Sequence, residues 1–301
     1  MASTQAFAYA VDGPTGSFHP WQISRRAVGE HDIGIDILYA GICHSDIHQA
    51  RNEWGGSIYP MVPGHEILGR VTQVGSKVTK FKTGDLAGIG CMVDSCRECK
   101  HCKEHEEQFC VKGGAMTYNS YEMDKKTPTY GGYSSYIVVT ESFALKVSDK
   151  FTKLEGVAPL FCAGITTYSP LRANQSKVGP GKKVGILGLG GLGHMGVKFA
   201  VSMGAEVTVF STSPSKEQDA KKLGAHHFVI TKEENALKNL AGQFDLILDT
   251  VSAKHDIMPY INALTPHGVL AIVGAPPEPL PLNTFGIIMG NKTIYGSLIG
   301  G

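Results

Sequence analysis

The sequence predicts an α/β plus β protein, in which a strand-rich first half is followed by a doubly wound parallel sheet. At 301 residues the chain is longer than a usual single domain of about 100 to 200 residues, so two domains are expected. Short strands between turns fill the chain up to about residue 150, and strands alternate with helices after it. We therefore expect one domain over residues 1–153 and a second over residues 154–301.

Apolar runs of strand length set the elements in order along the chain. The first half contains strand patterns at residues 33–41, 68–75 and 133–140. In the second half the pattern becomes strand, helix, strand, with helices expected over residues 192–203 and 214–223. This alternation predicts a parallel sheet covered by helices on both faces. Its six strands are expected at KKVGILG, EVTVFS, HFVI, FDLILDT, GVLAIVG and TIYGSL.

The charge balance excludes several classes of partner. Lysine plus arginine number 28 and aspartate plus glutamate 27, and no block of like charge is long enough for a nucleic-acid or membrane arm. No basic segment leads into an apolar run at the start, and nowhere do about 18 consecutive apolar residues occur. The sequence therefore predicts a cytoplasmic protein with a small, nearly neutral partner and with no nucleic acid or membrane partner.

Four of the seven cysteines lie in one polar loop at the spacing C-x2-C-x2-C-x7-C. In a large chain without an export signal, such a cluster points to a metal. Four thiolates enclose one tetrahedral ion and leave no position for substrate, so we expect a structural zinc. An iron–sulfur cluster or disulfides are the alternatives, although the final gap of seven and the following Val111 depart from the ferredoxin pattern. The predicted ligands are Cys96, Cys99, Cys102 and Cys110.

A second set of metal-ligating residues is scattered along the chain at Cys43, His65 and Cys162. Each alone is more often a buried core residue. Together, two thiolates and one imidazole form a zinc site with a fourth position open to water or substrate, which is the arrangement of a catalytic zinc. Glu66 is a candidate occasional fourth ligand, and Asp46 a candidate acceptor for the other ring nitrogen of His65. The sequence thus predicts two zinc ions per chain.

A glycine fingerprint follows the strand KKVGILG. Gly188, Gly190 and Gly193 fit G-x-G-x-x-G, in which the first glycine permits the turn and the second admits a pyrophosphate. Gly191 and Leu192 open the following helix, whose free N–H groups and positive dipole end favour an anion. The sequence predicts a dinucleotide site here, and a tight structural turn is the alternative.

The end of the next strand indicates which dinucleotide binds. An NAD enzyme places Asp or Glu there to accept from the ribose 2′-hydroxyl. This chain has Ser211, Thr212 and Ser213 instead, followed by Lys216, and these residues supply hydroxyl donors and a cation for a 2′-phosphate. NADP(H) is therefore predicted. The alternative is that the serines only cap the helix that begins at Pro214.

Several motifs in series resemble one enzyme family. GICHSDIH, PGHE, the four-cysteine loop and the glycine fingerprint occur in this order in zinc-dependent medium-chain alcohol dehydrogenases. DSCRECKHC, GGYSSYIVV and CAGITTYSPL are similar to their cinnamyl alcohol dehydrogenase-like branch, and the resemblance covers the whole chain. It implies a GroES-like catalytic β-barrel domain with both zinc sites and a Rossmann domain for NADP(H). The implied reaction interconverts a primary alcohol, aromatic or medium-chain, and its aldehyde.

The resemblance also implies roles for single residues. Zinc with an open position lowers the pKa of a bound alcohol, and Ser45, two residues after Cys43, is placed to take the proton. His48 would pass it to solvent through the cofactor ribose, and a solvated helix residue is the alternative. Thr166 matches a position near the nicotinamide. Positions that line the substrate pocket, and that could equally be core packing, fall at Trp54, Cys91, Tyr118 and Ile299.

Two other functions fit the sequence less well. A zinc polyol dehydrogenase accounts less well for Cys162 and the four-cysteine loop, and an idle NADPH-binding relative would not need every zinc ligand. By resemblance, an edge strand within residues 282–297 pairs two subunits, so we expect a homodimer. Members of the family also continue past the segment matching residues 296–301, with a helix and a return segment to the catalytic domain. We therefore expect that 301 residues represent a shortened form.

Overall fold

The structure is a computed structural model and describes residues 3–299. It contains two compact units, of which the first ends at Cys162 and the second covers Ala163–Ile299. From the sequence we expected the domain boundary between residues 153 and 154, and that boundary stays a prediction. Each unit has its own sheets and its own core.

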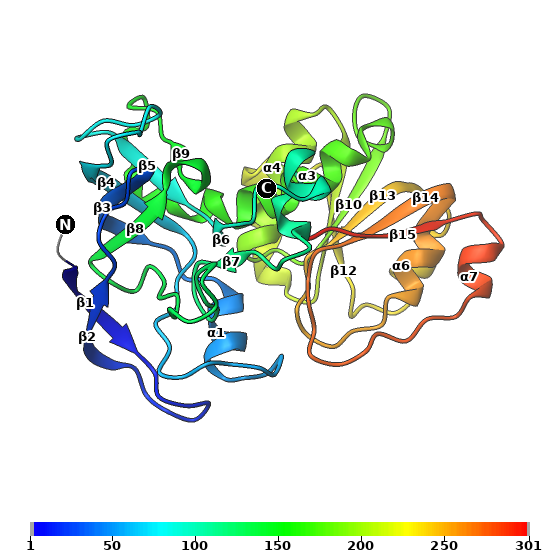
Figure 1. Ribbon diagram of the computed structural model, residues 1–301. Helices are drawn as coiled ribbons and strands as arrows, with labels where there is room; N and C mark the ends of the chain where they lie inside the picture. The colour runs from blue at the N-terminus through cyan, green and yellow to red at the C-terminus, as the bar shows by residue number, and fades with distance from the viewer. Residues whose placement is uncertain (1–2, 300–301) are drawn as a thin grey trace. The chain divides into compact units, whose positions relative to one another are not determined.

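The first unit is built from antiparallel strands (Figure 1). They are β1 (Thr4–Ala10), β2 (His19–Arg25), β3 (Asp32–Ala40), β4 (Ile67–Val74), β5 (Leu86–Ile89), β6 (Met92–Asp94), β7 (Ala115–Met116), β8 (Tyr136–Thr140) and β9 (Leu145–Lys146). The main sheet has the order β8-β3-β4-β5-β9, and β1 pairs with β2. Ile33 and Ile35 of β3 enter the core with Val71 and Ile137, whereas Asp36 is exposed. The predicted strand-rich first half is confirmed.

Short helical segments connect these strands. They are α1 (His44–Ala50), α2 (Lys100–Lys103), and the 3-10 turns η1 (Glu107–Phe109), η2 (Glu141–Phe143), η3 (Leu154–Gly156) and η4 (Ala158–Phe161). Helix α1 begins where it does because Cys43 is an extended N-cap and the Asp46 carboxylate accepts the Cys43 N–H at 3.0 Å. The start of this helix therefore carries three of the predicted site residues, Cys43, Ser45 and Asp46.

Six parallel strands form the sheet of the second unit (Figure 1). They are β10 (Lys183–Leu187), β11 (Glu206–Ser211), β12 (His227–Ile230), β13 (Phe244–Asp249), β14 (Leu264–Ile272) and β15 (Thr293–Gly296). In the strand order β12-β11-β10-β13-β14-β15, the chain reverses its direction across the sheet between β10 and β13. Doubly wound sheets bind dinucleotides at such a reversal. The predicted parallel sheet of six strands is confirmed.

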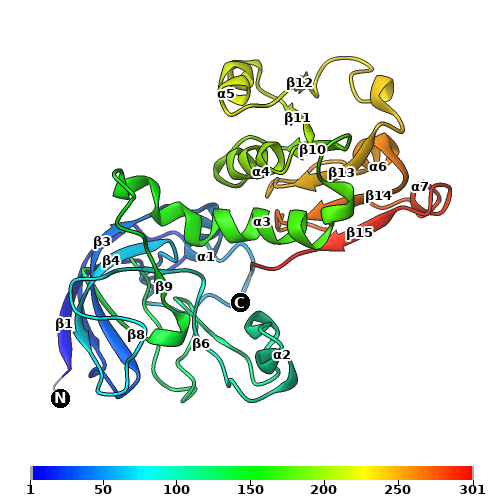
Figure 2. The ribbon, with the colours of Figure 1, turned by 90° about the horizontal axis from the view of Figure 1, so that it is seen from above.

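Helices cover both faces of this sheet. They are α3 (Ala163–Ala173), α4 (Gly191–Ser202), α5 (Glu217–Lys222), α6 (Met258–Ala263) and α7 (Phe285–Ile288), with the 3-10 turns η5 (Gln175–Lys177), η6 (Pro214–Lys216) and η7 (Lys238–Leu240). Figure 2 shows α3, α4 and α5 on one face and α6 and α7 on the other. Leu246 and Leu248 of β13 pack with the α4 core, and Ile247 packs with the α6 core. Burial on both faces explains why the inner strands, such as β13, are continuous apolar runs.

The ends of some elements differ from the sequence prediction. The helix expected over residues 192–203 is α4, which begins earlier because the extended Gly190 is its N-cap. The helix expected over residues 214–223 is shorter, because Pro214 opens the turn η6 before α5. The strand expected over residues 133–140 loses its first part and forms β8. No helix within residues 3–299 is long and apolar enough to cross a membrane.

Candidate metal centres and cofactor site

The four-cysteine loop gathers its thiols around one point. The sulfur atoms of Cys96, Cys99, Cys102 and Cys110 lie within 4.8 Å of one another. The Cys102 sulfur lies 3.4 Å from that of Cys99 and 3.9 Å from that of Cys96. All four cysteines are free, so disulfides do not close this loop. Four converging sulfurs form a closed tetrahedral ligand set.

Backbone N–H groups of the loop prepare these thiols for a cation. The Cys96 N–H donates to the Cys110 sulfur, and the Cys99 N–H donates to the Cys96 sulfur, both at 3.4 Å. Backbone hydrogen bonds, that from Cys102 above all, lower the pKa of Cys99 to about 6. Against the hydrogen bond with Ser95, burial and contact with Cys99 raise the pKa of Cys102 in the same loop to about 11. The loop as a whole supplies four converging sulfurs, which fits a structural zinc ion.

The second cluster lies entirely in the first unit. Cys43, His65, Glu66 and Cys162 are all buried, and their ligand atoms lie within 4.8 Å of one another. They come from the start of α1, the segment before β4 and the residue after η4. The Cys162 sulfur lies 3.9 Å from the Cys43 sulfur and 3.2 Å from Nε2 of His65. The fold thus brings together four residues that are far apart in the sequence.

The Asp46 carboxylate holds this cluster in place. One oxygen lies 3.0 Å from Nδ1 of His65 and accepts the Gly64 N–H at 3.1 Å. The other accepts the Cys43 N–H and the Tyr133 hydroxyl, both at 3.0 Å. Burial acts to raise the pKa of Asp46, but hydrogen bonds led by that from His65 keep it below its usual value. With Nδ1 of His65 held by a carboxylate, Nε2 is left to face the sulfurs.

The chemistry of the donors fits a divalent cation. Contact with Cys162, together with burial, raises the pKa of Cys43 to about 12, and burial raises the pKa of Glu66 to about 8. These groups are therefore ionised at neutral pH only when a cation stabilises them. Gly41 leaves room for the Glu66 carboxylate, because a Cβ there would lie 2.0 Å from one of its oxygens. Two sulfurs and one imidazole suit zinc and leave a fourth position for Glu66, water or substrate.

The glycine fingerprint forms a tight turn between β10 and α4. Gly188 has a φ of +88°, which favours glycine. A Cβ at Gly193 would lie 2.1 Å from the Gly188 carbonyl oxygen. Around Gly190 and Gly191, in contrast, no heavy atom lies within 4 Å of such a Cβ. Leu192 follows in the first turn of α4, where backbone N–H groups have no acceptor within the helix. The close packing at Gly193 and the open space at Gly190 and Gly191 suit a pyrophosphate.

Hydroxyl groups and one cation lie at the end of β11. The buried Ser211 accepts the Ser213 N–H through its hydroxyl at 3.1 Å. Ser213 is the N-cap of η6, but its side chain makes no capping hydrogen bond, so helix capping does not account for this serine. The Lys216 amine donates to the Leu189 carbonyl at 2.9 Å, which places a cation at the glycine turn. Thr212 is exposed beside them.

Comparisons with known proteins cover both units. Residues 29–149 match the family described as "Alcohol dehydrogenase GroES-like domain", and residues 191–301 match "Zinc-binding dehydrogenase". The chain is 52% identical over 297 residues to "Probable formaldehyde dehydrogenase AdhA" of Bacillus subtilis, over 99% of this chain and 84% of that protein. This chain belongs to the zinc-dependent medium-chain alcohol dehydrogenases.

Two solved structures place this alcohol dehydrogenase in the cinnamyl alcohol dehydrogenase-like branch. A cinnamyl alcohol dehydrogenase of Sorghum bicolor superposes with a TM-score of 0.95 at 43% identity, over 99% of this chain and 84% of that one. The CAD of Helicobacter pylori, complexed with NADP(H), gives 0.93 at 50% identity, over 100% and 85%. The family, the GroES-like domain and the Rossmann domain predicted from the motifs are confirmed. The predicted zinc and NADP(H) agree with these relatives.

In this dehydrogenase His48 is buried, so the alternative of a solvated helix residue is wrong. Its side chain is 4% exposed, and its ring stacks between those of His44 and Trp54, with centroids 4.5 and 4.6 Å away. Nδ1 pairs with the Glu53 carboxylate. Nε2 is buried and has no hydrogen-bond partner among the described residues. A buried nitrogen without a partner is costly, so Nε2 of His48 has an unmet need for a hydrogen bond.

Sequence reasoning missed two residues of this dehydrogenase site. Glu53 lies five positions after His48 and beyond the end of α1, so no helical spacing connects the two. Tyr133 reaches Asp46 from the segment before β8, although GGYSSYIVV served only to establish the resemblance. Burial raises the pKa of Tyr133 above its usual range, so this hydroxyl stays a donor. A conspicuous motif was the one signal that could have drawn attention to Tyr133.

Two of the predicted pocket residues contact the catalytic cluster, and a third contacts His48. Tyr118 stacks on the His65 ring with the centroids 5.7 Å apart. Cys91 interacts with Cys162 through its thiol. Trp54 stacks on the His48 ring. An aromatic ring and a thiol therefore contact two of the zinc ligands within the first unit.

The remaining predicted residues are divided between the units. The Ser45 hydroxyl lies 3.6 Å from the Cys43 sulfur. Thr166 and Ile299 belong to the second unit. Thr166 is buried, and Oγ1 has no hydrogen-bond partner in the described part of the chain. The roles of Thr166 near the nicotinamide and of Ile299 in the pocket stay predictions.

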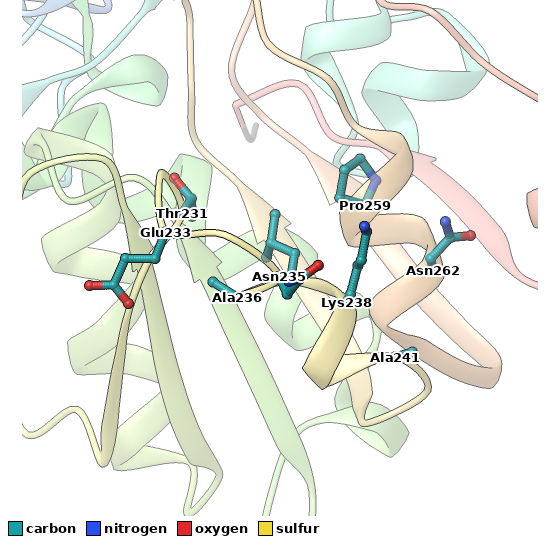
Figure 3. A pocket seen from close by; sticks show the side chains of 9 residues that line it. Thr231, Glu233, Asn235, Ala236, Lys238, Ala241, Pro259 and Asn262 are labelled. Atoms are coloured by element: carbon teal, nitrogen blue, oxygen red, sulfur yellow. The ribbon is translucent and has the colours of Figure 1, made fainter.

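The second unit also contains a cavity of about 580 Å³ between residues 231–241 and helix α6 (Figure 3). Lys238 points toward Pro259 and Glu233 points away from it, so their charges do not converge on one ligand (Figure 3). The lining contains none of the predicted site residues, so this is not the predicted cofactor site. It consists of Thr231, Glu233, Asn235, Ala236, Leu237, Lys238, Ala241, Pro259 and Asn262.

Proposed function

We propose that this enzyme interconverts a primary alcohol, aromatic or medium-chain, and its aldehyde with NADP(H). The observation that carries the proposal is the buried set of Cys43, His65 and Cys162, together with the unpaired Nε2 of a histidine on α1. Three ligands to zinc leave one position for substrate. His48 is buried on α1, the helix that begins at the ligand Cys43, and would serve proton transfer.

The cofactors supply the chemistry that side chains lack. Zinc, when held by Cys43, His65 and Cys162, supplies a Lewis acid that makes an alcohol more acidic and a carbonyl more electrophilic. NADP(H), when held at the glycine turn, accepts or delivers the hydride. The protein's own residues bind these groups and move the proton.

Ser45 and His48 form the proposed path for that proton. They lie three positions apart on one face of α1. Ser45 takes the proton of the substrate hydroxyl, and Nε2 of His48 takes it next, since a ring that donates Nδ1–H to Glu53 keeps a lone pair on Nε2. The Nδ1 proton can then move to Glu53, whose side chain is 41% exposed. This provides an outlet besides the cofactor ribose predicted from the sequence.

The preference for NADP(H) over NAD(H) rests on the end of β11. Ser211 stands where a carboxylate would repel a 2′-phosphate, and Lys216 supplies a positive charge. Replacing Ser211 with Asp should weaken NADPH binding and relatively favour NADH, because like charges then lie close together. Fluorescence titrations with both cofactors measure the change. Unchanged dissociation constants would mean that the 2′-phosphate binds elsewhere.

The substrate class is proposed from the side chains around the zinc ligands. Tyr118 stacks on His65, Cys91 interacts with Cys162, and Trp54 stacks on His48. These side chains suit aromatic or medium-chain substrates.

A substrate panel tests the proposal. Cinnamaldehyde and benzaldehyde are supplied with NADPH, and sorbitol with NADP⁺, each with and without a zinc chelator. We expect both aldehydes to be reduced rapidly, sorbitol to be oxidised slowly, and chelation to stop turnover. A preference for sorbitol would identify a zinc polyol dehydrogenase. NADPH binding without turnover of any substrate would identify an idle relative.

We infer that two copies of the chain pair at the edge strand β15. Strand β15 ends the sheet order, so one side of it has no partner strand within residues 3–299. Next to it, Leu282, Phe285, Ile288 and Met289 are exposed. Exposed apolar groups beside a free edge favour association. Light scattering should show a dimer, and a monomer at all concentrations would contradict it.

A cytoplasmic location stays a prediction.

A further inference from the structure

The segment after β13 lies where a doubly wound sheet binds its dinucleotide. Strands β10 and β13 are neighbours at the reversal of strand order. Thr250 donates to the Leu187 carbonyl from its N–H at 3.1 Å and from its hydroxyl at 2.8 Å. A Cβ at Gly188 would lie 3.1 Å from Oγ1 of Thr250 and 3.1 Å from a methyl group of Val251. Thr250 and Val251 therefore form a wall of the glycine turn.

His255 holds this wall through two polar contacts. Its Nε2 lies 2.9 Å from a carboxylate oxygen of Asp249, and its Nδ1 lies 2.8 Å from the Ala253 carbonyl oxygen. The other oxygen of Asp249 accepts the Val251 N–H at 3.0 Å. The carboxylate side chain is 1% exposed and the imidazole 16%. The histidine thus ties the segment after β13 back to the last residue of the strand.

Both partners of the His255 ring are acceptors. A carboxylate and a carbonyl oxygen cannot donate, and a neutral imidazole has only one N–H. Only the imidazolium can donate to Asp249 and Ala253 at the same time. The hydrogen bond to Asp249 is the main cause that raises the pKa of His255, against burial and with help from the Ala253 carbonyl.

The other charges near this ring leave that assignment unchanged. Asp256, the next residue, adds negative charge that also raises the pKa of His255. Lys254, the residue before His255, forms an ion pair with Glu278. Tyr260 of α6 faces the same carboxylates, and burial raises its pKa to about 12, so it is neutral.

We propose that His255, as the imidazolium, is a positioning residue for NADP(H), and that loss of its proton loosens residues 250–253 and weakens cofactor binding. The proposal rests on the cofactor site proposed above. His255 acts through Thr250 and Val251, and no contact of its own with the cofactor is invoked. Because the pKa of His255 is raised, the contribution is complete below the ordinary value of 6.5 and is lost as the pH rises through the folded value.

Fluorescence titration of NADPH onto the zinc-loaded chain tests this proposal. The range from about pH 7 to about pH 9.5 is used, where a phosphate group with a second pKa of about 6 is fully ionised. The dissociation constant of the unaltered enzyme should rise roughly 2- to 10-fold with pH, as expected for the loss of one hydrogen bond. In His255→Gln the glutamine amide can donate hydrogen bonds but does not titrate. The dissociation constant of this variant for NADPH should therefore not rise with pH in this way. His227→Gln is the matched control, since His227 is an exposed histidine 2.9 Å from Glu206 and should keep the pH step.

The outcomes separate this proposal from the cofactor site on which it rests. Failure of the unaltered enzyme to bind NADPH at any pH would overturn both. Tight binding with a flat pH profile, or a His255 ring that NMR shows to be neutral at pH 7, would overturn the positioning role alone. If His255→Gln does not fold, hydrogen exchange at the Val251 amide of the unaltered enzyme decides: its protection should fall with the same pH step, and unchanged protection contradicts the proposal.

Discussion

The two metal clusters of the first unit are built in opposite ways. The four cysteines of the loop lie within residues 96–110, and backbone N–H groups of the same loop donate to their sulfurs. Cys43 and Cys162 of the other cluster are 119 positions apart, and the Asp46 carboxylate organises that cluster. The loop site therefore depends on local chain geometry, whereas the scattered site exists only once the unit has folded.

The thiols of the two clusters also differ in acidity. Backbone donors lower the pKa of Cys99 to about 6, whereas the neighbouring Cys162 and burial raise the pKa of Cys43 to about 12. Cys99 thus ionises readily without a cation, whereas Cys43, like Cys102 of the loop with its pKa raised to about 11, needs a cation to ionise. We expect zinc at the loop site to serve stability and zinc at the buried site to serve catalysis.

The largest expected effect is that of Cys43→Ser on activity. Turnover should fall by about 1000-fold or more, because a Lewis acid contributes several kcal/mol and about 1.4 kcal/mol is a tenfold change in rate. Metal analysis should show loss of one of two zinc ions, and circular dichroism should show a folded chain. A Cys43→Ser enzyme with full activity would remove this residue from the catalytic site.

Replacement of Cys99 by Ser should instead act on stability. A closed zinc site contributes its binding energy to folding. We expect the melting temperature to fall by roughly 10 °C, at about 2 to 4 °C per kcal/mol for a unit of this size. Limited proteolysis should cut the loop first. If the melting temperature and the zinc content are unchanged, the loop does not hold a structural ion.

A smaller effect is expected from Asp46→Asn. The substitution keeps the shape of the side chain but removes the charge that orients His65. Loss of such an outer partner should weaken zinc binding at the buried site by about 10- to 100-fold. Competition with a chromophoric chelator measures the affinity. Asp36→Asn is the matched control, because Asp36 is an exposed carboxylate of the same unit. Equal zinc affinity of the two variants would contradict the role of Asp46.

The same contrast explains what the sequence could predict. The loop ligands follow from spacing, since four cysteines close together in a polar loop of a large chain indicate a metal. Cys43, His65 and Cys162 were found by their conjunction and by resemblance to a family. Glu53 and Tyr133 were missed, because each contact joins residues that no local periodicity relates. Burial of the His48 ring is likewise a property of the fold, and the sequence left it undecided.

In the second unit the sheet was more predictable than its site. Apolar runs mark all six strands, and the four inner strands are largely buried on both faces. Glycines mark the turn where a Cβ would collide. The pair of Asp249 and His255 is different. Asp249 is the last residue of β13, but His255 lies in the irregular segment between β13 and α6, where neither strand nor helix period applies. Such contacts become visible only when both ring nitrogens can be placed beside their acceptors.

The smallest expected effect concerns Gly41, which makes room for the Glu66 carboxylate. In Gly41→Ala the new Cβ would lie 2.0 Å from one carboxylate oxygen and 2.9 Å from the Glu66 Cβ, so this side chain must shift. Gly13→Ala is the matched control, because a Cβ at Gly13 has no heavy atom within 4 Å. We expect Gly41→Ala to cost about 1 to 3 kcal/mol of stability through overpacking. If Glu66 assists zinc exchange as an occasional ligand, radioactive zinc should exchange several-fold more slowly at the buried site and at an unchanged rate at the loop site. Equal slowing at both sites, or none at either, would leave the Glu66 carboxylate without a role in metal exchange.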